Sequence, residues 1–365
     1  MEQVEVRLGD RSYGIKIGYG ILNDFGQAYS DMGFAISVVI VTNPTVAELY
    51  LKPVRQGLEA AGCRVTVLTM PDGEEHKTLE TARELYGGLI QAGIDRSSML
   101  VALGGGVVGD TAGFVAATYL RGIDFVQVPT TLEAQVDASV GGKTAVDHPL
   151  GKNMVGAFHQ PRMVYIDTET LMSLPRREVA AGTSEVIKHG IIRDPELFGF
   201  LENNLEAMVD LELAPEDLIW VIARNCQIKA GVVSSDETEK GLREILNYGH
   251  TVGHAIEVVT EYQEFKHGEA VSLGMIAAGK IALDKGLWHP DDFDRQTELL
   301  RRLGIQKGVN HLDPLALLDR MESDKKVRDG VIRFVLPESI GQASTCDTVT
   351  RDEMLNGIAF MMKIH

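Results

Sequence analysis

The sequence has few cysteines and no long apolar run. Three cysteines occur in 365 residues, Cys63, Cys226 and Cys346, and none belongs to a C-x-x-C pair. An odd number of widely spaced cysteines excludes a disulfide framework and a cysteine-rich zinc knuckle. No stretch approaches the roughly 18 apolar residues of a transmembrane helix, and the first residues lack the basic and apolar regions of a signal peptide. We therefore expect a cytoplasmic protein.

Basic residues are outnumbered. The chain carries 35 lysines and arginines against 52 aspartates and glutamates, a net charge of -17. Nucleic acids and anionic membranes require a basic face, so neither is expected as a partner. A small anionic substrate is compatible with this balance, because a few convergent cations can bind it locally. The 44% of hydrophobic residues is enough for a globular fold with a sizeable core.

The first half of the chain alternates between strand-like and helical patterns. Helical spacing of apolar residues marks 46–61 and 78–92. The strand-like runs, which are apolar and often β-branched, are 38–41, 64–70, 99–103, 125–128 and 163–166. This alternation predicts βαβ units and a mostly parallel sheet. Residues 4–8 and 13–17 are typical of a hairpin that leads into the sheet.

The pattern changes after Leu174-Pro175. The helical patterns that follow are 176–193, 195–210, 215–234, 241–260, 268–286, 291–303 and 314–323. One strand-like run occupies 331–336. We therefore expect an α/β nucleotide-binding domain over 1–175 and a mostly α-helical domain over 176–365, with the functional residues in the cleft between them.

A glycine-rich loop follows the strand-like run 99–103. Residues 104–110 read G-G-G-V-V-G-D and fit G-x-G-x-x-G, in which glycines let the backbone approach a phosphate at a helix N-terminus. A tight strand-to-helix turn explains the same glycines equally well. Polar loops at 71–78 and 129–131 follow two other strands. Because the carboxyl ends of parallel strands share one edge of a sheet, the three loops together predict a ligand crevice.

Two lysines lie beside glycines in the next segment. Residues 140–144 read V-G-G-K-T and residues 151–153 read G-K-N. Lys143 and Lys152 can therefore approach an anion without a bulky neighbour in the way. A solvated surface lysine is the ordinary explanation of either one alone.

The strongest chemical signal lies in the helical half. His250 and His254 are four residues apart and share one helix face. His267 begins another helix, and Glu185 lies in the middle of an otherwise apolar one. Imidazoles and a carboxylate from separate helices predict a divalent metal site, most simply zinc, and three protein ligands would leave positions open for catalysis. The spacing alone does not decide which three residues bind.

Taken together, these motifs resemble those of the 3-dehydroquinate synthases, which are sugar phosphate cyclases. The motifs that carry the resemblance are G-G-G-V-V-G-D, P-T-T-L-E-A-Q-V-D-A-S-V-G-G-K-T, G-K-N-M-V-G-A-F, S-E-V-I-K-H-G, L-N-Y-G-H-T-V-G-H-A-I-E and H-G-E-A-V-S. They occur in order over nearly the whole chain. The resemblance implies NAD and one divalent metal, zinc or cobalt, as cofactors.

The resemblance also implies roles for individual residues. The implied metal ligands are Glu185, His250 and His267, with His254 as a catalytic group near the substrate. The residues implied for NAD are Asp72, Gly73, Glu74, Glu75, His76, Lys77, Gly104, Gly105, Gly106, Val107, Val108, Gly109, Asp110, Thr130, Thr131, Lys143 and Lys152. The residues implied at the substrate are Asp137, Lys143, Lys152, Asn153, Lys188, Lys229, Arg243, Asn247 and one of Lys325 and Lys326. Arg121 would reach the phosphate from the neighbouring subunit of a homodimer.

The implied reaction turns 3-deoxy-D-arabino-heptulosonate 7-phosphate into 3-dehydroquinate and phosphate. It proceeds by transient oxidation by NAD, phosphate elimination, re-reduction, ring opening and intramolecular aldol closure, as a step of the shikimate pathway to aromatic amino acids. The active site would lie in the cleft between the two domains.

Three other functions fit parts of the pattern. A metal-dependent polyol dehydrogenase of the same fold would not need several cations converging on a phosphate and a carboxylate. The substrate of a deoxy-inosose synthase carries a phosphate but no carboxylate, whereas Arg243 and Asn247 favour a substrate with a carboxylate. A non-catalytic NAD-sensing protein would not need every candidate ligand and the catalytic histidine.

Overall fold

A computed structural model describes residues 1–304, 308–323 and 332–364. Their contacts divide the chain into two compact units, Met1–Leu174 with Ala214–Thr238, and Pro175–Leu213 with Glu239–His365. The division expected from the sequence assigned 214–238 to the second part. These residues join the first unit because α8 (Pro215–Ser235) packs against β1 and β2 of that unit. The functional roles given to the two parts stay predictions.

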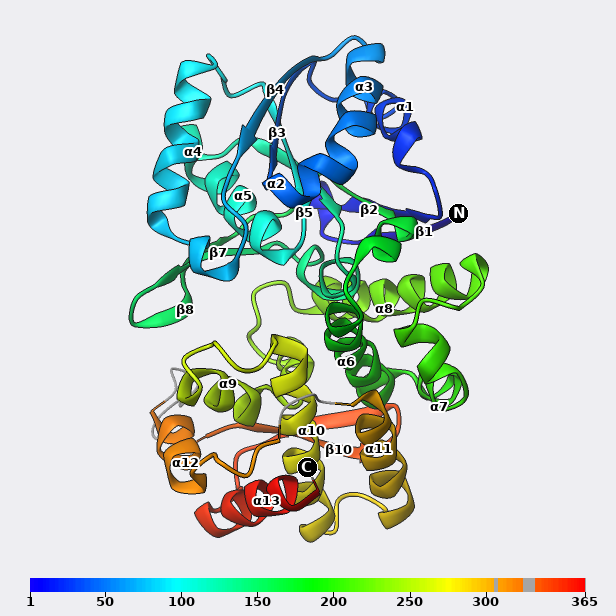
Figure 1. Cartoon of the computed structure of the whole chain (residues 1–365), viewed down its shortest axis with the longest axis vertical. Helices are drawn as coiled ribbons and strands as arrows, with labels where there is room; N and C mark the ends of the chain where they lie inside the picture. Colours follow the sequence, from blue (N-terminus) through cyan, green and yellow to red (C-terminus); the bar gives the residue numbers. More distant parts are fainter. Residues whose placement is uncertain (305–307, 324–331, 365) are drawn as a thin grey trace. The chain divides into compact units, whose positions relative to one another are not determined.

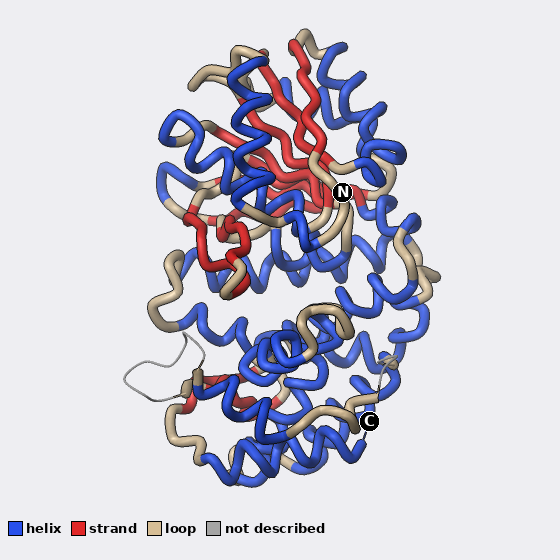
Figure 2. The backbone as a smooth tube through the Cα atoms, turned by 60° about the vertical axis from the view of Figure 1, so that its left-hand side comes forward, coloured by secondary structure: helices blue, strands red, loops and turns tan. Residues whose placement is uncertain are grey.

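The first unit is built on a seven-stranded sheet (Figures 1 and 2). β1 (Glu2–Val6) and β2 (Tyr13–Gly18) form the expected antiparallel hairpin, and the other pairs in the sheet are parallel. The order across the sheet is β1-β2-β9-β6-β5-β3-β4. The remaining strands are β3 (Ser37–Thr42), β4 (Arg64–Thr69), β5 (Met99–Gly104), β6 (Asp124–Pro129) and β9 (Met163–Asp167). The predicted α/β class is confirmed.

The central strands are buried on both faces. On β3, Val39 belongs to the same apolar cluster as Leu85 of α4, whereas Ile40 belongs to a second cluster with Leu58 of α3. A strand covered on both faces needs apolar residues at successive positions, which explains the continuous apolar runs in the sequence. The helices of this unit are α1 (Phe25–Ser30), α2 (Pro44–Val46), α3 (Lys52–Ala60), α4 (Leu79–Gln91), α5 (Gly106–Thr118) and α8.

The direction in which the chain crosses the sheet changes after β4. β4 lies at the sheet edge beside β3, the chain then returns to β5 on the other side of β3, and β6 and β9 follow outward. The strand order therefore reverses between β3 and β5. In parallel α/β sheets ligands bind beyond the carboxyl ends of the strands at such a point. The loops that follow Thr42 and Gly104 flank it.

A two-stranded sheet in the first unit is not expected from the sequence. β7 (Lys143–His148) and β8 (Gly151–Phe158) pair antiparallel. None of the β8 residues is fully buried, and its apolar residues, Met154, Val155, Ala157 and Phe158, do not alternate with polar ones. Without a buried face it has no hydrophobic alternation to reveal it.

The second unit is mainly helical (Figure 2). Its helices are α6 (Arg176–Arg193), α7 (Pro195–Val209), α9 (His250–Val259), α10 (His267–Asp284), α11 (Pro290–Leu303), α12 (Pro314–Glu322) and α13 (Arg351–Ile364). β10 (Phe334–Ser339) and β11 (Gln342–Cys346) form an antiparallel pair. The strand-like run predicted over 331–336 becomes β10, although Val331 lies outside the described residues. β11 and α13 were not predicted.

The helix predicted over 241–260 is wrong in its first part. Leu242–Asn247 forms a 3-10 turn, and Gly249 separates this turn from α9 with a φ of 81°. Glycine adopts left-handed backbone without steric cost. Gly249 therefore lets the chain turn sharply, so that α9 begins at His250.

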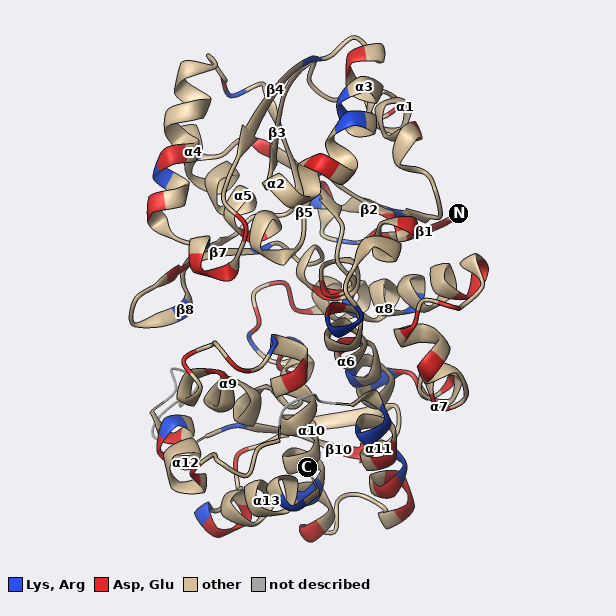
Figure 3. Cartoon of the chain, viewed as in Figure 1, with Lys and Arg blue, Asp and Glu red and all other residues tan. Residues whose placement is uncertain are grey.

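Charged residues of both signs lie along α11, acidic in its first turn and basic in its last (Figure 3). Arg295 of this helix forms two hydrogen bonds with Glu202 of α7, at 2.8 and 2.7 Å. Arg302 forms two with Glu206 of α7, at 3.0 and 2.7 Å. Paired guanidinium–carboxylate contacts fix the register of two helices even where solvent screening keeps their contribution to stability small. No helix in the described ranges is long and apolar enough to cross a bilayer.

The close approach of α9 and α10 gives a test of the packing. A Cβ at Gly274 of α10 would overlap the carbonyl oxygen of Gly249, which is backbone and cannot rotate away. Gly274→Ala should therefore lower the free energy of unfolding by about 1–3 kcal/mol, as overpacking does. Urea denaturation followed by circular dichroism measures it.

Gly199→Ala is the matched control, since this helical glycine of the same unit has no atom within 4 Å of a built Cβ. It should raise stability by about 0.5–1 kcal/mol. Equal effects of the two substitutions would contradict the packing described here.

Candidate functional site

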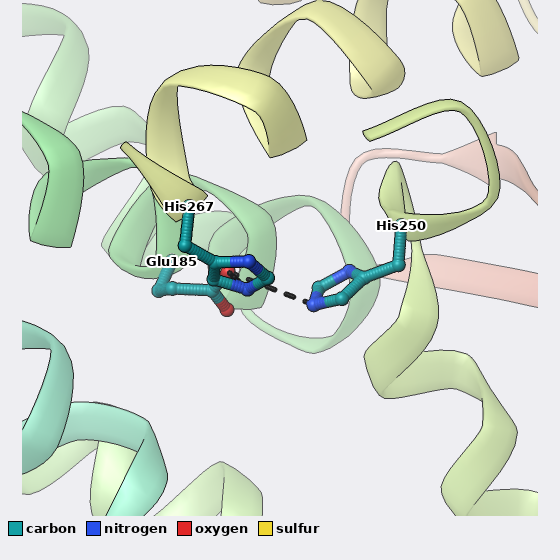
Figure 4. A group of neighbouring side chains, drawn as sticks. All are labelled: Glu185, His250 and His267. Atoms are coloured by element: carbon teal, nitrogen blue, oxygen red, sulfur yellow. Dashed lines mark ion pairs between the residues drawn. The ribbon is translucent and has the colours of Figure 1, made fainter. Parts of the chain in front are cut away.

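Three side chains of the second unit point toward one another and form a candidate metal site (Figure 4). Glu185 lies in the middle of α6, His250 is the first residue of α9, and His267 is the first residue of α10. The Nε2 atoms of His250 and His267 lie 3.9 and 3.8 Å from Glu185 Oε1. One donor atom of each residue lies within 4.8 Å of the other two, so a single cation could be bound by all three.

Hydrogen bonds donated by the second ring nitrogens orient both imidazoles. His250 Nδ1 lies 3.1 Å from the carbonyl oxygen of Tyr248, and His267 Nδ1 lies 3.4 Å from Glu257 Oε1. A carbonyl or carboxylate oxygen can only accept, so each Nδ1 carries the proton and each Nε2 keeps its lone pair. Both lone pairs are thereby available on the side of Glu185, as a metal ligand requires.

The carboxylate of Glu185 has the environment of a metal ligand. It is fully buried, and neither oxygen accepts a hydrogen bond from a described residue. Lys188 Nζ, which is 1% exposed, forms an ion pair with Oε2 without hydrogen-bond geometry. Burying a charge is costly unless it is paired or bound to a metal. Two nitrogens and one oxygen are a donor set that suits zinc and similar divalent ions.

Ion pairs hold the start of α10 against α6. Arg177 of α6 donates to both carboxylate oxygens of Glu269, at 2.7 and 2.6 Å. Glu269 Oε2 also accepts from the backbone N–H of Lys266 at 2.8 Å, which caps α10 one residue before His267. The helix that carries Glu185 is therefore tied directly to the turn that carries His267.

His254 lies beside the same cluster. Its ring centroid is 5.3 Å from that of His250 and 6.0 Å from that of His267. His254, Glu257 and His267 also have donor atoms within 4.8 Å of one another. Of the four residues that the spacing left open, Glu185, His250 and His267 form one such group, whereas the group with His254 includes Glu257. The full burial and missing hydrogen bonds of Glu185 favour the group with His250.

Two other predicted substrate residues of this unit lie on the 3-10 turn before Gly249. Arg243 is 1% exposed, and Asn247 Nδ2 donates to Glu239 Oε1 at 2.9 Å. Glu239 was not singled out in the sequence. It precedes the turn by three residues with a φ of 59°, and no periodicity marks such a position.

The glycine-rich loop joins β5 to α5 in the first unit. A Cβ at Gly105 would lie 2.9 Å from Thr131 Cγ2, and a Cβ at Gly109 would lie 2.8 Å from Gln127 Oε1. Packing therefore accounts for these two glycines, in agreement with the explanation of the loop as a tight strand-to-helix turn. At Gly106 the nearest atom would be 3.6 Å away, so this position has room. No described side chain caps the N-terminus of α5, and its N–H groups lie at the edge expected for a phosphate.

Lys77 connects two of the predicted cofactor and substrate segments. Its Nζ donates to Asp110 Oδ2 at 2.6 Å and to Asn153 Oδ1 at 2.7 Å. Burial alone would lower the pKa of Lys77, but the negative charges of Asp110 and Glu74 outweigh burial and raise this pKa above its usual value. The ammonium is therefore charged at neutral pH and ties the loop after β4 to α5 and β8.

Further contacts hold the β7–β8 hairpin to the same loop. Lys152 Nζ lies 3.1 Å from Glu74 Oε1. Asn153 adopts a left-handed φ of 55°, and its N–H donates to Asp147 Oδ1 at 2.7 Å. The N–H of Asp147 donates in turn to the Lys77 carbonyl oxygen at 2.7 Å. Asp147 was missed in the sequence because its role depends on a hairpin that the sequence does not reveal.

A second lysine–aspartate pair belongs to the first unit. Lys229 Nζ, on α8, donates to the carbonyl oxygen of Asp137 at 2.6 Å and to its Oδ1 at 2.5 Å. The structure thus brings together two residues that are 92 positions apart and that were both predicted at the substrate. This contact adds to the packing of α8 on β1 and β2 of the first unit.

The loop after β6 carries Thr130 and Thr131. It begins where the N–H of Thr130 donates to the Gly104 carbonyl oxygen at 3.0 Å, so this loop and the glycine-rich loop are adjacent. The loop after β3 was missed. Thr45 Oγ1 in it donates to Asp72 Oδ2 at 2.9 Å, but only the strand order shows that it flanks the reversal point.

Arg121, Lys143 and the segment 324–326 complete the set of predicted residues. Arg121 is exposed, with a φ of 71° in the turn after α5, and no hydrogen bond or ion pair among the described residues joins it to another predicted site residue. Lys143 is exposed at the start of β7. Asp324, Lys325 and Lys326 lie outside the described residues.

Comparison with solved structures shows the same architecture in sugar phosphate cyclases. A 2-deoxy-scyllo-inosose synthase complexed with carbaglucose-6-phosphate, NAD+ and Co2+ is 28% identical with a TM-score of 0.88, over 98% of this chain and 99% of that one. A 2-epi-5-epi-valiolone synthase from Streptomyces hygroscopicus with NAD+ and Zn2+ bound is 27% identical, with a TM-score of 0.89 and the same coverage. A glycerol dehydrogenase from Schizosaccharomyces pombe, at 16% identity and a TM-score of 0.69 over 96% of this chain and 89% of that one, shares the fold.

Sequence comparison gives the family. The family model for the N-terminal part of 3-dehydroquinate synthase matches residues 67–181, and the model for its C-terminal part matches residues 182–327. The 3-dehydroquinate synthase of Pelotomaculum thermopropionicum is 49% identical over 97% of this chain and 95% of its own length. That of a Nostoc species is 48% identical over 96% and 97%. The chain therefore belongs to the 3-dehydroquinate synthase family.

Proposed function

We propose that this protein converts 3-deoxy-D-arabino-heptulosonate 7-phosphate to 3-dehydroquinate and phosphate. It is a carbon–oxygen lyase of the shikimate pathway, and it depends on NAD and one divalent metal, zinc or cobalt. Relatives of 45–50% identity over nearly the full length carry this name. The cyclases of similar structure were solved with NAD+ and Co2+ or Zn2+.

The main structural support for this function is the candidate metal site. Glu185, His250 and His267 form a donor cluster in which the carboxylate is fully buried and both imidazoles present Nε2 to it. This arrangement fits the metal of a cyclase. It also answers the alternative of a non-catalytic NAD sensor, which would have no need of an oriented metal site.

The chain supplies binding, orientation and proton handling. When bound, NAD supplies a reversible oxidation of one substrate hydroxyl and the metal supplies Lewis acidity. Lys188, next to Glu185, holds a positive charge where an anionic substrate oxygen would bind beside the metal position. His254 lies on the same side of α9 as His250 and places an imidazole that can hold or transfer a proton.

The cationic residues distinguish a cyclase from a dehydrogenase. We assign Arg243 and Asn247 to the carboxylate of the substrate. Its remaining anionic groups and hydroxyls are assigned to Asp137, Lys143, Lys152, Asn153, Lys188 and Lys229. A polyol dehydrogenase has no comparable anion to bind, so it would not need this set of cations at its substrate. We also propose that the protein is a cytoplasmic homodimer in which Arg121 reaches the phosphate of the neighbouring subunit, a proposal that rests on the family resemblance.

The role of NAD gives the decisive test of the reaction. Since the hydride is returned after phosphate leaves, one NAD should serve many turnovers, whereas a dehydrogenase accumulates NADH in step with product. With substrate in large excess over NAD, inorganic phosphate should exceed the NAD supplied many times over, with only a trace of NADH by absorbance at steady state. NADH formed in proportion to product would overturn the cyclase and favour the polyol dehydrogenase.

The two histidines of α9 should respond differently to substitution. His250→Ala removes a ligand and should weaken zinc binding by more than the roughly 10–100-fold that loss of a partner outside the ligand set costs. His254→Ala should keep one equivalent of zinc and lose about 10²–10⁴-fold in kcat, as loss of an acid–base group does. Metal analysis after dialysis, together with steady-state rates, separates the two. Equal loss of zinc in both variants would contradict the assignment of His250 over His254.

The shared phosphate site predicts complementation between inactive variants. A mixed dimer of Arg121→Ala and Lys152→Ala subunits contains one site in which both residues are intact. After subunit exchange, the mixture should regain about a quarter of the wild-type rate, because half of randomly formed dimers are mixed and each has one intact site. Each variant alone under the same exchange conditions is the control. No recovery after proven exchange would place Arg121 in its own subunit's site.

A further inference from the structure

Glu257 is a buried carboxylate for which neither the family resemblance nor the sequence pattern gives a role. It lies seven residues after His250 and three after His254, so all three share one face of α9. Its neighbours on the helix are mostly apolar, and the residue is 4% exposed. A carboxylate in such a position is costly unless a partner satisfies it, and Glu257 has His267 as one partner.

His267 lies between two carboxylates. Its Nδ1 is 3.4 Å from Glu257 Oε1, and its Nε2 is 3.8 Å from Glu185 Oε1. Since Glu257 accepts the Nδ1 proton, the lone pair is on Nε2 and faces Glu185. The ring of His250 is held in the same sense by a neutral carbonyl oxygen, that of Tyr248. The two rings therefore differ at Nδ1, which faces a carboxylate in His267 and a carbonyl oxygen in His250.

We propose that Glu257 is a positioning residue for the metal ligand His267. Its carboxylate fixes the tautomer and the plane of the His267 ring and makes Nε2 a stronger donor to the cation than the ring would be alone. This inference rests on the metal site of the proposed function and adds to it the origin of the donor strength of one ligand.

The competing arrangement uses Glu257 as a ligand. His254, Glu257 and His267 also have donor atoms within 4.8 Å of one another. A neutral imidazole offers one lone pair, so His267 serves a single cation either with Glu185 or with Glu257. With Glu257 as the ligand, Glu185 would remain fully buried with no hydrogen bond from a described residue. The arrangement with Glu185 as ligand and Glu257 as hydrogen-bond acceptor satisfies both carboxylates.

The test compares two substitutions that remove the same charge. Glu257→Gln keeps the shape of the side chain and should lower zinc affinity about 10–100-fold, measured by competition with a chromophoric chelator. Glu261→Gln is the control, because Glu261 is exposed just beyond the end of α9 and should leave the affinity unchanged. The thermal midpoint of the metal-free Glu257→Gln protein should match that of the metal-free wild type, since the expected loss concerns the metal and not the fold. The visible spectrum of the cobalt-loaded variant should shift, because the donor strength of one ligand has changed.

Each other outcome contradicts the proposal. Wild-type affinity and an unchanged cobalt spectrum in Glu257→Gln would mean that Glu257 does not act on the ligand. Complete loss of zinc in Glu257→Gln, with zinc retained in Glu185→Gln, would make Glu257 a ligand itself. These results differ from a failure of the proposed function, which the release of phosphate by the wild type tests separately.

A second measurement covers a variant that fails to fold. In a crystal structure of the wild type with zinc, the cation should be bonded to Nε2 of His267, with an oxygen of Glu257 about 2.7–3.2 Å from Nδ1. Zinc bonded to Nδ1 of His267 or to Glu257 would overturn the proposal.

Discussion

The buried carboxylate of Glu185 is the constraint around which the second unit is arranged. A charge without hydrogen bonds in the middle of a buried helix is unfavourable unless cations surround it. The chain supplies Lys188 from the same helix and directs two imidazole lone pairs toward the same point. The backbone features that achieve this, the left-handed Gly249 before α9 and the capped start of α10, place each histidine at the first position of its helix. A histidine at the first position of a helix is fixed through its backbone by the start of the helix and through its ring by a hydrogen bond, so its position as a ligand is rigid.

Many of the helices and strands could be predicted from the sequence, because buried elements leave a pattern of apolar residues. The strand over 99–103 was recognisable because both of its faces are covered, and α6 was predicted with the bounds that the structure has. The β7–β8 hairpin was not, since no β8 residue is fully buried and its apolar residues do not alternate with polar ones. The membership of α8 in the first unit depends on contacts such as Lys229 with Asp137, and contacts between residues 92 positions apart have no local signature.

The same distinction applies to the candidate site. The residue types and their order predicted Glu185, His250 and His267 as ligands through the family resemblance, while spacing alone left His254 as an equal choice. The roles of Glu257 and Asp147 emerged only from coordinates. For Glu257 a signal was present, because its spacing of three from His254 puts a carboxylate on the histidine face of an otherwise apolar helix. For Asp147 there was none.

Lys77 gives the first unit a property of another kind. An ammonium has three N–H donors, and here two of them bind Asp110 on α5 and Asn153 on β8. The segments that the resemblance assigns to cofactor and to substrate thus share one buried charge. A ligand that binds one segment and shifts these hydrogen bonds changes the free energy with which the other segment binds its own ligand. By thermodynamic linkage, the second ligand changes the binding free energy of the first by the same amount. The affinity for the cofactor then depends in part on the loop that binds the substrate, and the affinity for the substrate depends in part on the loop that binds the cofactor.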